Sequence, residues 1–168
     1  MKSRLKTNIL LTAFLGSSAE LLIKNTDNHG ILFLPNDKIK DSEILIDAIS
    51  KETIDYVISF GQKPNIRNKV YIETAANKGE LKINTAFDCD KLTGLFEENS
   101  IASKISQNAG TSFCNELYFN GLKYIEYNKL HTKMIFIHIP FTKNITDFDV
   151  FRRNMFNVIK EFENMTYS

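Results

Sequence analysis

The sequence predicts an α/β protein, built as a three-layer α/β/α sandwich around a mostly parallel central sheet. Short apolar runs alternate with helix-like segments along the chain, a pattern typical of strands covered by helices on both faces. Parallel strands of this kind should connect by right-handed crossovers. No repeat, low-complexity tract or linker divides the chain, so residues 1–168 are expected to form a single domain.

In the first half of the chain, the expected strands are apolar runs that end at turn residues. The elements are, in order, a strand at 8–14, a helix at 18–24, a strand at 31–34, a helix at 41–51 and a strand at 56–60. Pro35 and Gly61 end the second and third strands. Asp41 or Ser42 is the expected N-cap of the second helix, whose apolar residues share one face.

The second half continues the alternation. Its elements are a strand at 69–74, a helix at 90–97, a strand at 101–106, a helix at 112–126, a strand at 133–138 and a helix at 146–164. Gly121 weakens the helical pattern of 112–126 slightly. Thr146 and Asp149 resemble a capping box at the start of the last helix, which carries an apolar stripe.

Composition and charge exclude several classes of function. The chain is 43% hydrophobic and 24% charged, which is ordinary for a globular protein with a full core. The net charge is +1 and the basic residues are spread out, so neither nucleic acid nor a membrane surface is an expected partner. The apolar runs are too short to span a bilayer, and the N-terminus lacks the pattern of a secretory signal. A cytoplasmic location is therefore expected.

The cysteines and histidines are few and scattered. Cys89 and Cys114 are the two cysteines, and no disulfide is expected between them in a reducing compartment. His29, His131 and His138 stand apart, without the spacing of zinc ligands. Neither a metal nor another cofactor is expected. His29 and His131 lie in polar contexts and are expected at the surface.

The stretch 108–115 contains the first candidate for a reactive group. Cys114 follows a glycine-containing turn and opens an apolar helix-like run. Considered alone, a free cysteine is more often a buried small apolar residue. However, the N–H groups of a first helical turn stabilise a thiolate and later an oxyanion. We therefore expect an acidified thiol at Cys114, whereas Asp88 and Asp90 disfavour a thiolate at Cys89.

Two further residues are candidates for acid–base chemistry. His138 lies in an apolar run that ends a strand, where it is either a core histidine or a general base. Glu73, at the end of another strand, is the preferred group to orient the imidazole, with Asp88 and Glu80 as reserves. A lone strand-end carboxylate is more often simply exposed. Reactive groups of α/β sheets gather at strand ends, which favours the combination.

Two of these segments resemble motifs of one family. Residues 109–115, Ala-Gly-Thr-Ser-Phe-Cys-Asn, and residues 136–140, Phe-Ile-His-Ile-Pro, are similar to the cysteine and histidine motifs of the pyroglutamyl peptidase I (pyrrolidone-carboxylate peptidase) family of cytosolic cysteine peptidases. Weaker matches occur at 33–35 and 59–62, and the resemblance runs from about Asn8 to the last helix. It implies a triad of Cys114, His138 and Glu73, a peptide substrate with a blocked N-terminus, and a homodimer or homotetramer.

The match around the glutamate requires a choice of register. A gap-free match from Gly61 puts Ile72 where the family has its glutamate. One extra residue in the 62–66 loop instead brings both Arg67 and Glu73 onto family positions, and one residue fewer before Asn77 restores the rest. We prefer this second register because one local change recovers two functional positions.

The chain also departs from the family pattern. The family opens with Gly-Phe-Glu-Pro-Phe-Gly-Gly, whose phenylalanines grip a lactam ring, whereas residues 12–18 keep only Phe14. The loop between the glutamate and cysteine segments is shortened. The resemblance implies that Phe14 and Phe113 line a ring pocket, that Gln62 helps to hold the ring, and that Arg67 assists the oxyanion. Three functions stay open: hydrolysis of a pyroglutamyl or related cyclic or small acyl group, ligand binding by a catalytically weakened relative, and acyl transfer or amide hydrolysis on another substrate by the same triad.

Overall fold

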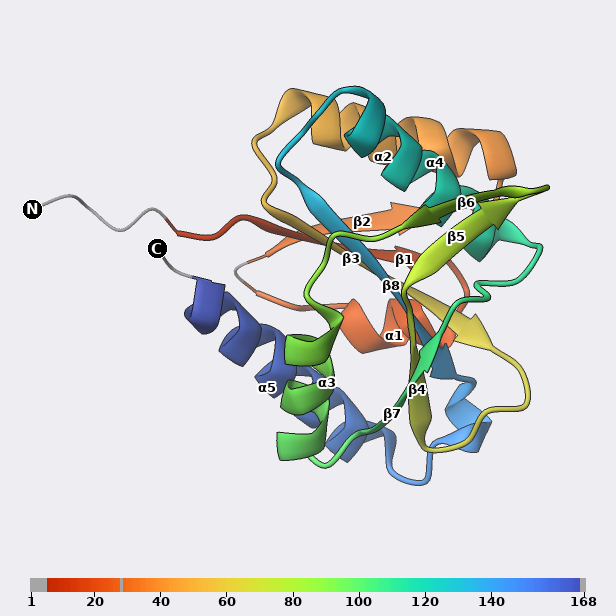
Figure 1. Ribbon diagram of the computed structural model, residues 1–168. Coiled ribbons are helices and arrows are strands. Elements are labelled where there is room, and N and C mark those ends of the chain that lie inside the picture. The colour runs from red at the N-terminus through yellow and green to blue at the C-terminus, as the bar shows by residue number, and fades with distance from the viewer. Residues whose placement is uncertain (1–5, 28, 167–168) are drawn as a thin grey trace, which may run out of the picture.

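The protein is built around a six-stranded sheet (Figure 1). The computed structural model describes residues 6–27 and 29–166. The strands, in their order across the sheet, are β2 (Gly30–Leu34), β1 (Ile9–Phe14), β3 (Tyr56–Lys63), β8 (Lys133–Pro140), β4 (Lys69–Glu73) and β7 (Ala102–Ser106). Neighbouring strands are parallel except β4 and β8, which are antiparallel. The predicted α/β class with a mostly parallel sheet is confirmed.

Helices cover both faces of this sheet (Figure 1). They are α1 (Ser18–Ile23), α2 (Lys38–Lys51), α3 (Cys89–Glu98), α4 (Phe113–Tyr127) and α5 (Phe148–Thr166), with a short 3₁₀ turn at Thr142–Asn144. α2 and α4 pack on one face, and α1, α3 and α5 on the other. Within the described part of the chain, no helix is long and apolar enough to cross a membrane. Residues 1–5, part of the N-terminal segment considered above, lie outside the described residues.

Several predicted ends differ from the structure because other side chains supply the caps. α2 starts at Lys38, since Asp37 accepts hydrogen bonds from the backbone N–H groups of Ile39 and Lys40. Asp41 is therefore inside the helix and buried, instead of capping it. At α5, Asp147 accepts from the Val150 N–H, so the expected cap at Thr146 is displaced by one residue.

The sequence patterns did not predict a β-hairpin between β4 and α3. β5 (Ala75–Lys78) and β6 (Leu81–Asn84) pair antiparallel and form a separate two-stranded sheet beside α4. Gly79 has φ of +60° in the connecting turn, a conformation that glycine adopts without strain. The alternation of Leu81 and Ile83 with polar neighbours after a glycine turn was the available signal.

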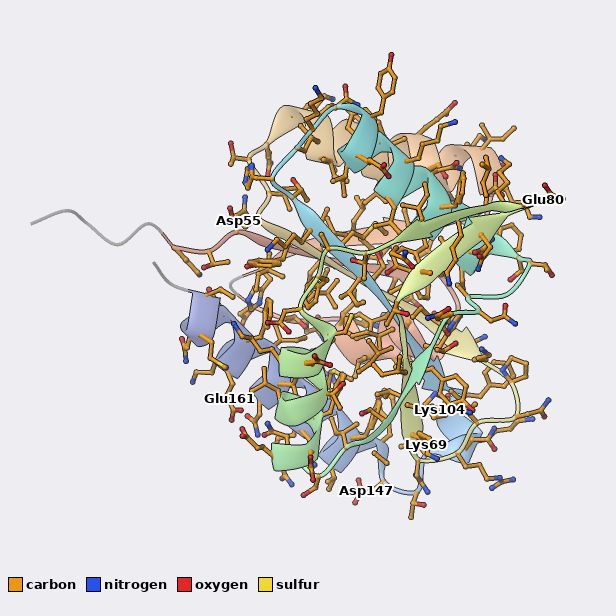
Figure 2. All side chains as sticks on the ribbon, in the orientation of Figure 1. Asp55, Lys69, Glu80, Lys104, Asp147 and Glu161 are labelled. Atoms are coloured by element: carbon orange, nitrogen blue, oxygen red, sulfur yellow. The ribbon has the colours of Figure 1, made fainter. Side chains whose placement is uncertain are left out.

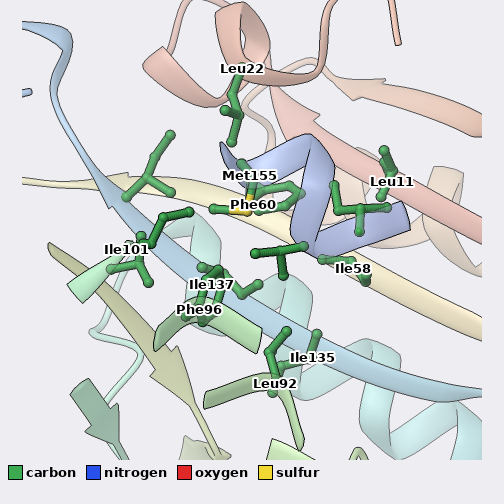
Figure 3. Packing of buried hydrophobic residues seen from close by; sticks show 14 of the residues in the cluster. Leu11, Leu22, Ile58, Phe60, Leu92, Phe96, Ile101, Ile135, Ile137 and Met155 are labelled. Carbon is green, nitrogen blue, oxygen red and sulfur yellow. The ribbon is translucent and has the colours of Figure 1, made fainter. Parts of the chain in front are cut away.

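The two faces of β8 carry different side chains. Ile135, Ile137 and Ile139 point into the apolar cluster under α1, α3 and α5 (Figure 3). Met134 and Phe136 belong to the cluster under α2 and α4, on the face that His138 shares by alternation. His138 is therefore directed to the same side of the sheet as Cys114, which belongs to that second cluster.

Candidate active site

Cys114 is the second residue of α4. The turn before the helix contains Gly110 with φ of +89°, and Ser112 is the N-cap, although its side chain makes no capping hydrogen bond. The first-turn N–H groups are thus left without a capping side chain near the cysteine. Cys114 is 9% exposed and packs in the apolar cluster of this face.

The Cys114 sulfur lies directly over Gly61 of β3. A Cβ atom added to Gly61 would be 2.7 Å from Sγ and 2.8 Å from the Phe136 ring, so a residue without a side chain is required here. Gly61 pairs with His138 across the β3–β8 ladder. The fold thereby places the sulfur of the predicted nucleophile, carried by α4, over β3 and next to β8, the strand that carries the predicted base. Among the described residues, no hydrogen bond joins the Cys114 thiol to the His138 ring.

His138 and Glu73 form a buried pair. Nδ1 of His138 lies 2.8 Å from Oε1 of Glu73, and the two residues are 3% and 0% exposed. The antiparallel register of β4 and β8 sets Glu73 opposite Phe136, on the face that also carries the imidazole. The structure therefore brings Glu73, which the preferred register selected, together with His138. Ile72, the gap-free alternative, points into the opposite apolar cluster.

The reserve carboxylates lie elsewhere. Glu80 is at the tip of the β5–β6 hairpin (Figure 2). Asp88 caps α3 by accepting a hydrogen bond from the Lys91 N–H. Neither carboxylate contacts His138.

The expected acidification of the thiol is wrong. Burial, and secondarily the charge of Glu73, raise the pKa of Cys114 to about 12. The cysteine's own backbone N–H and the Lys63 ammonium lower the pKa of this thiol, but less than burial raises it. The helix start therefore does not yield a resting thiolate. Burial and two neighbouring aspartates likewise raise the pKa of Cys89, to about 11.

Two of the predicted pocket residues are on the same side of the sheet as Cys114 or next to it in the chain. Phe14, at the end of β1, is buried in the same apolar cluster as Cys114, with its ring centroid 6.5 Å from that of Phe136. Phe113 precedes Cys114 and is 38% exposed, which leaves its ring available to a ligand. An apolar wall beside the thiol is thus present.

Gln62 and Arg67 are used differently from the expectation. The Gln62 side-chain oxygen accepts a hydrogen bond from the Ser18 N–H at 3.0 Å, so it holds the start of α1. Arg67 is exposed and lines a separate hollow with Phe141 and Lys143. No described contact joins Arg67 to the catalytic candidates, because the loop after β3 carries it away from the thiol. Its expected role at an oxyanion is not supported.

Three polar features of the site were missed by sequence reasoning. Lys63 approaches Glu73, with Nζ 3.6 Å from Oε1. Asn115 exchanges hydrogen bonds with the Asn77 backbone, donating at 2.7 Å and accepting at 3.1 Å, and so ties α4 to the hairpin. Asp41 is 1% exposed, and burial raises its pKa. The charges of Lys63 and Asp41 affect the Cys114 pKa only because the folded chain brings these distant residues near the thiol. No local sequence pattern therefore marks them.

The remaining histidines lie outside this site. His29 is largely buried, with Nε2 2.9 Å from Oε2 of Glu163, contrary to the expected surface position, whereas His131 is exposed. Both cysteines are free thiols. In the part of the chain that the structure describes, no cluster of histidine, cysteine and acidic side chains is arranged to hold a metal ion.

Comparisons with known proteins relate the chain to pyroglutamyl peptidases. The family model for pyroglutamyl peptidase matches residues 84–152, which include both Cys114 and His138. The chain is 30% identical over 138 residues to the pyrrolidone-carboxylate peptidase of Brachyspira hyodysenteriae, covering 69% of each protein. It is 31% identical over 121 residues to pyrrolidone-carboxylate peptidase 2 of Caldanaerobacter subterraneus subsp. tengcongensis, covering 59% of this chain and 58% of that relative.

Solved structures share the fold. Pyrrolidone carboxyl peptidase from Fervidobacterium islandicum AW-1 superposes with a TM-score of 0.79 at 16% identity, over 95% of this chain and 99% of that one. The enzyme from Thermococcus litoralis gives a TM-score of 0.77 at 18% identity, over 93% and 92% of the two chains. These structural likenesses concern the fold, whereas the 30% identity to the Brachyspira hyodysenteriae enzyme over 69% of each protein shows the relationship: the chain belongs to the pyroglutamyl peptidase family.

Proposed function

We propose that this protein is a cysteine peptidase that removes an N-terminal pyroglutamyl group from peptides. The observation that carries the proposal is the buried hydrogen bond between His138 and Glu73, with the Cys114 sulfur over the neighbouring Gly61. A nucleophile, a base and a carboxylate that orients the base form the constellation needed for acyl transfer.

In the proposed reaction, the Cys114 sulfur attacks the carbonyl carbon of the scissile amide. His138 accepts the thiol proton and then gives it to the leaving nitrogen, so that the amine departs and a thioester remains. Because Nδ1 faces Glu73, the other ring nitrogen, Nε2, is the one that exchanges this proton. Water activated by His138 then cleaves the thioester and restores the thiol.

The high thiol pKa determines how the nucleophile is activated. A thiol with a pKa of about 12 is protonated at neutral pH, so little thiolate exists before substrate binds. Attack must therefore be coupled to proton transfer to His138, and the buried Glu73 carboxylate stabilises the imidazolium that results. The uncapped N–H groups at the start of α4 are the proposed donors to the oxyanion.

The proposed substrate class comes from the relatives and from the apolar wall. The relatives are named pyrrolidone-carboxylate peptidases, and this chain spans 58% of one of them and 69% of another. Phe14 and Phe113 are the proposed contacts for the lactam ring. We also propose the cytoplasm as location and a homodimer or homotetramer as assembly, as in the family.

The test is hydrolysis of a pyroglutamyl fluorogenic amide by purified protein. Cys114→Ala should abolish turnover, and Glu73→Gln should lower kcat by about a thousandfold or more, because a neutral amide does not stabilise the imidazolium. Cys89→Ala is the matched control and should retain activity. Unchanged turnover in Cys114→Ala would sink the proposal.

A second candidate function is binding of a small molecule or peptide without efficient turnover. The high thiol pKa and the reduced Thr12–Ser18 segment favour it. A protein of this kind would melt at higher temperature in the presence of pyroglutamyl peptide but release no product. Product formation that depends on Cys114 excludes this alternative.

A further inference from the structure

Lys63 makes a set of contacts that links three parts of the site. It is the last residue of β3, and its side chain is 28% exposed. Its ammonium lies 3.6 Å from Oε1 of Glu73 and donates a hydrogen bond at 3.3 Å to the carbonyl oxygen of Asn108. It also lies 4.9 Å from the centre of the Tyr71 ring. One side chain thus contacts β4 and the turn that leads to Cys114.

The Glu73 carboxylate needs a balancing charge. It is fully buried, and its second oxygen, Oε2, has no hydrogen-bond partner among the described residues. A buried carboxylate without compensation tends to take up a proton, and a neutral acid would not stabilise an imidazolium. Apart from the His138 ring, Lys63 is the basic side chain that the described residues place against this carboxylate.

The same ammonium supports the turn before the nucleophile. Asn108 begins the turn 108–110, in which Asn108 also accepts a hydrogen bond from the Gly110 N–H. Four residues after Gly110 the chain reaches Cys114. The Lys63 ammonium lies between the Glu73 carboxylate and the Asn108 carbonyl. It therefore links the His138–Glu73 pair to the turn that precedes Cys114.

Resting on the function proposed above, we propose that Lys63 is a positioning residue of the reaction, which holds the Glu73 carboxylate in place beside His138 and anchors the Asn108–Gly110 turn that precedes Cys114. It touches neither substrate nor sulfur. It acts through the carboxylate and the turn, and its positive charge also lowers the pKa of the Cys114 thiol.

Other charged and titratable groups also face this site. They are Asp41 of α2, Tyr71 and Glu73 of β4, Lys104 of β7 and His138 of β8. Lys104 provides a matched control, since its ammonium lies 5.5 Å from the same Tyr71 ring but contacts no triad residue, and it projects from the outer strand (Figure 2). A change in charge at Lys104 alters the surroundings of Tyr71 without altering those of Glu73.

The first experiment measures alkylation of Cys114 by iodoacetamide across a range of pH, with Cys89 as internal reference. Because Lys63 lowers the pKa of the Cys114 thiol, its removal lowers the thiolate fraction at a given pH. We expect Lys63→Met to slow Cys114 alkylation about tenfold at neutral pH, which corresponds to a shift of about one unit. Lys63→Arg should stay near wild type, and Lys104→Met should not differ from it.

The second experiment measures the pH profile of kcat/KM on the pyroglutamyl amide. In Lys63→Met the pH profile should differ in position from that of wild type, with kcat lowered and KM little changed. Lys63→Gln is measured beside it, and melting curves establish that both variants are folded. Profiles that coincide with wild type, or an equal shift in Lys104→Met, overturn the role of Lys63.

The two proposals fail in different ways. If wild type hydrolyses the amide but neither alkylation nor the profile depends on Lys63, the role of Lys63 is wrong and the peptidase function stands. If wild type does not hydrolyse the amide, the peptidase function is wrong, and the alkylation series still decides whether Lys63 tunes the site.

Discussion

The two faces of β8 show how one strand serves two purposes. Ile135, Ile137 and Ile139 enter a cluster that is apolar throughout (Figure 3). Because side chains alternate along a strand, Phe136 and His138 face the opposite side of the sheet. The buried polar residues Glu73 and Asp41 also lie on that side, near Cys114. The apolar face stabilises the fold, whereas the other face holds charged and reactive groups at a cost to stability.

This difference shows why the site is positioned firmly. Buried polar groups stay in place only when the surrounding structure determines their position. The isoleucines of β8 fix the strand from behind, so that His138 meets Glu73 at hydrogen-bond distance. Stability and reactivity should therefore respond separately to changes on the two faces.

The largest effect on stability should come from the apolar face. Ile137 is 1% exposed, and Ile137→Ala should lower the free energy of unfolding by about 3 kcal/mol, because it removes buried methyl groups and leaves a cavity. Cys114→Ala on the other face should cost less than about 1.5 kcal/mol. Urea unfolding monitored by circular dichroism measures both. Equal losses would mean that the two faces contribute alike.

A smaller effect is expected where the two strands of the site meet. Gly61→Ala should cost about 2 kcal/mol, because the new methyl group collides with Sγ of Cys114 and the Phe136 ring. The control is Gly94→Ala within α3, where an added Cβ meets no atom within 4 Å and should stabilise the helix by up to about 1 kcal/mol. Thermal melting separates these opposite signs. Stabilisation by Gly61→Ala would contradict the position assigned to the sulfur.

The smallest effect concerns the buried carboxylate on α2. Burial raises the pKa of Asp41 above 3.8, so the unfolded chain loses this proton more readily and stability falls as pH rises from about 3.8 through the folded value. Asp41→Asn removes this loss. The variant should melt above wild type near neutral pH, and the gain should shrink toward about pH 4. Asp47→Asn, at an exposed site on the same helix, should show no such dependence.

Much of the fold could be predicted because its signals are local. Apolar runs, glycine turns and helical periodicity marked all six strands of the main sheet and the five helices covering it. The residues that cap α2 and α5 were harder to predict. Asp37 and Asp147 cap these helices, but nearby polar residues are equally suitable as N-caps by residue type. The hairpin of β5 and β6 was missed because each strand is four residues long and only half of its residues are apolar.

In the candidate site, too, features with a local sequence signal could be predicted and those that depend on the folded structure could not. Cys114 and His138 are marked by their neighbours in the sequence, and Glu73 by its place at a strand end, so all three could be selected before the structure. The thiol pKa could not, because it depends on how completely α4 covers the sulfur and on charges from β3, β4 and α2. The role expected for Arg67 stays a prediction, because a motif match does not fix the direction in which a loop carries a side chain, and here Arg67 lines another hollow.

The paired hydrogen bonds between Asn115 and the Asn77 backbone have a mechanical consequence. They join the hairpin to the residue next to Cys114, although the hairpin forms no ladder with the main sheet. The hairpin cannot swing outward without breaking bonds made by the immediate neighbour of the sulfur. A displacement of the β5–β6 hairpin is therefore coupled to the position of the Cys114 sulfur.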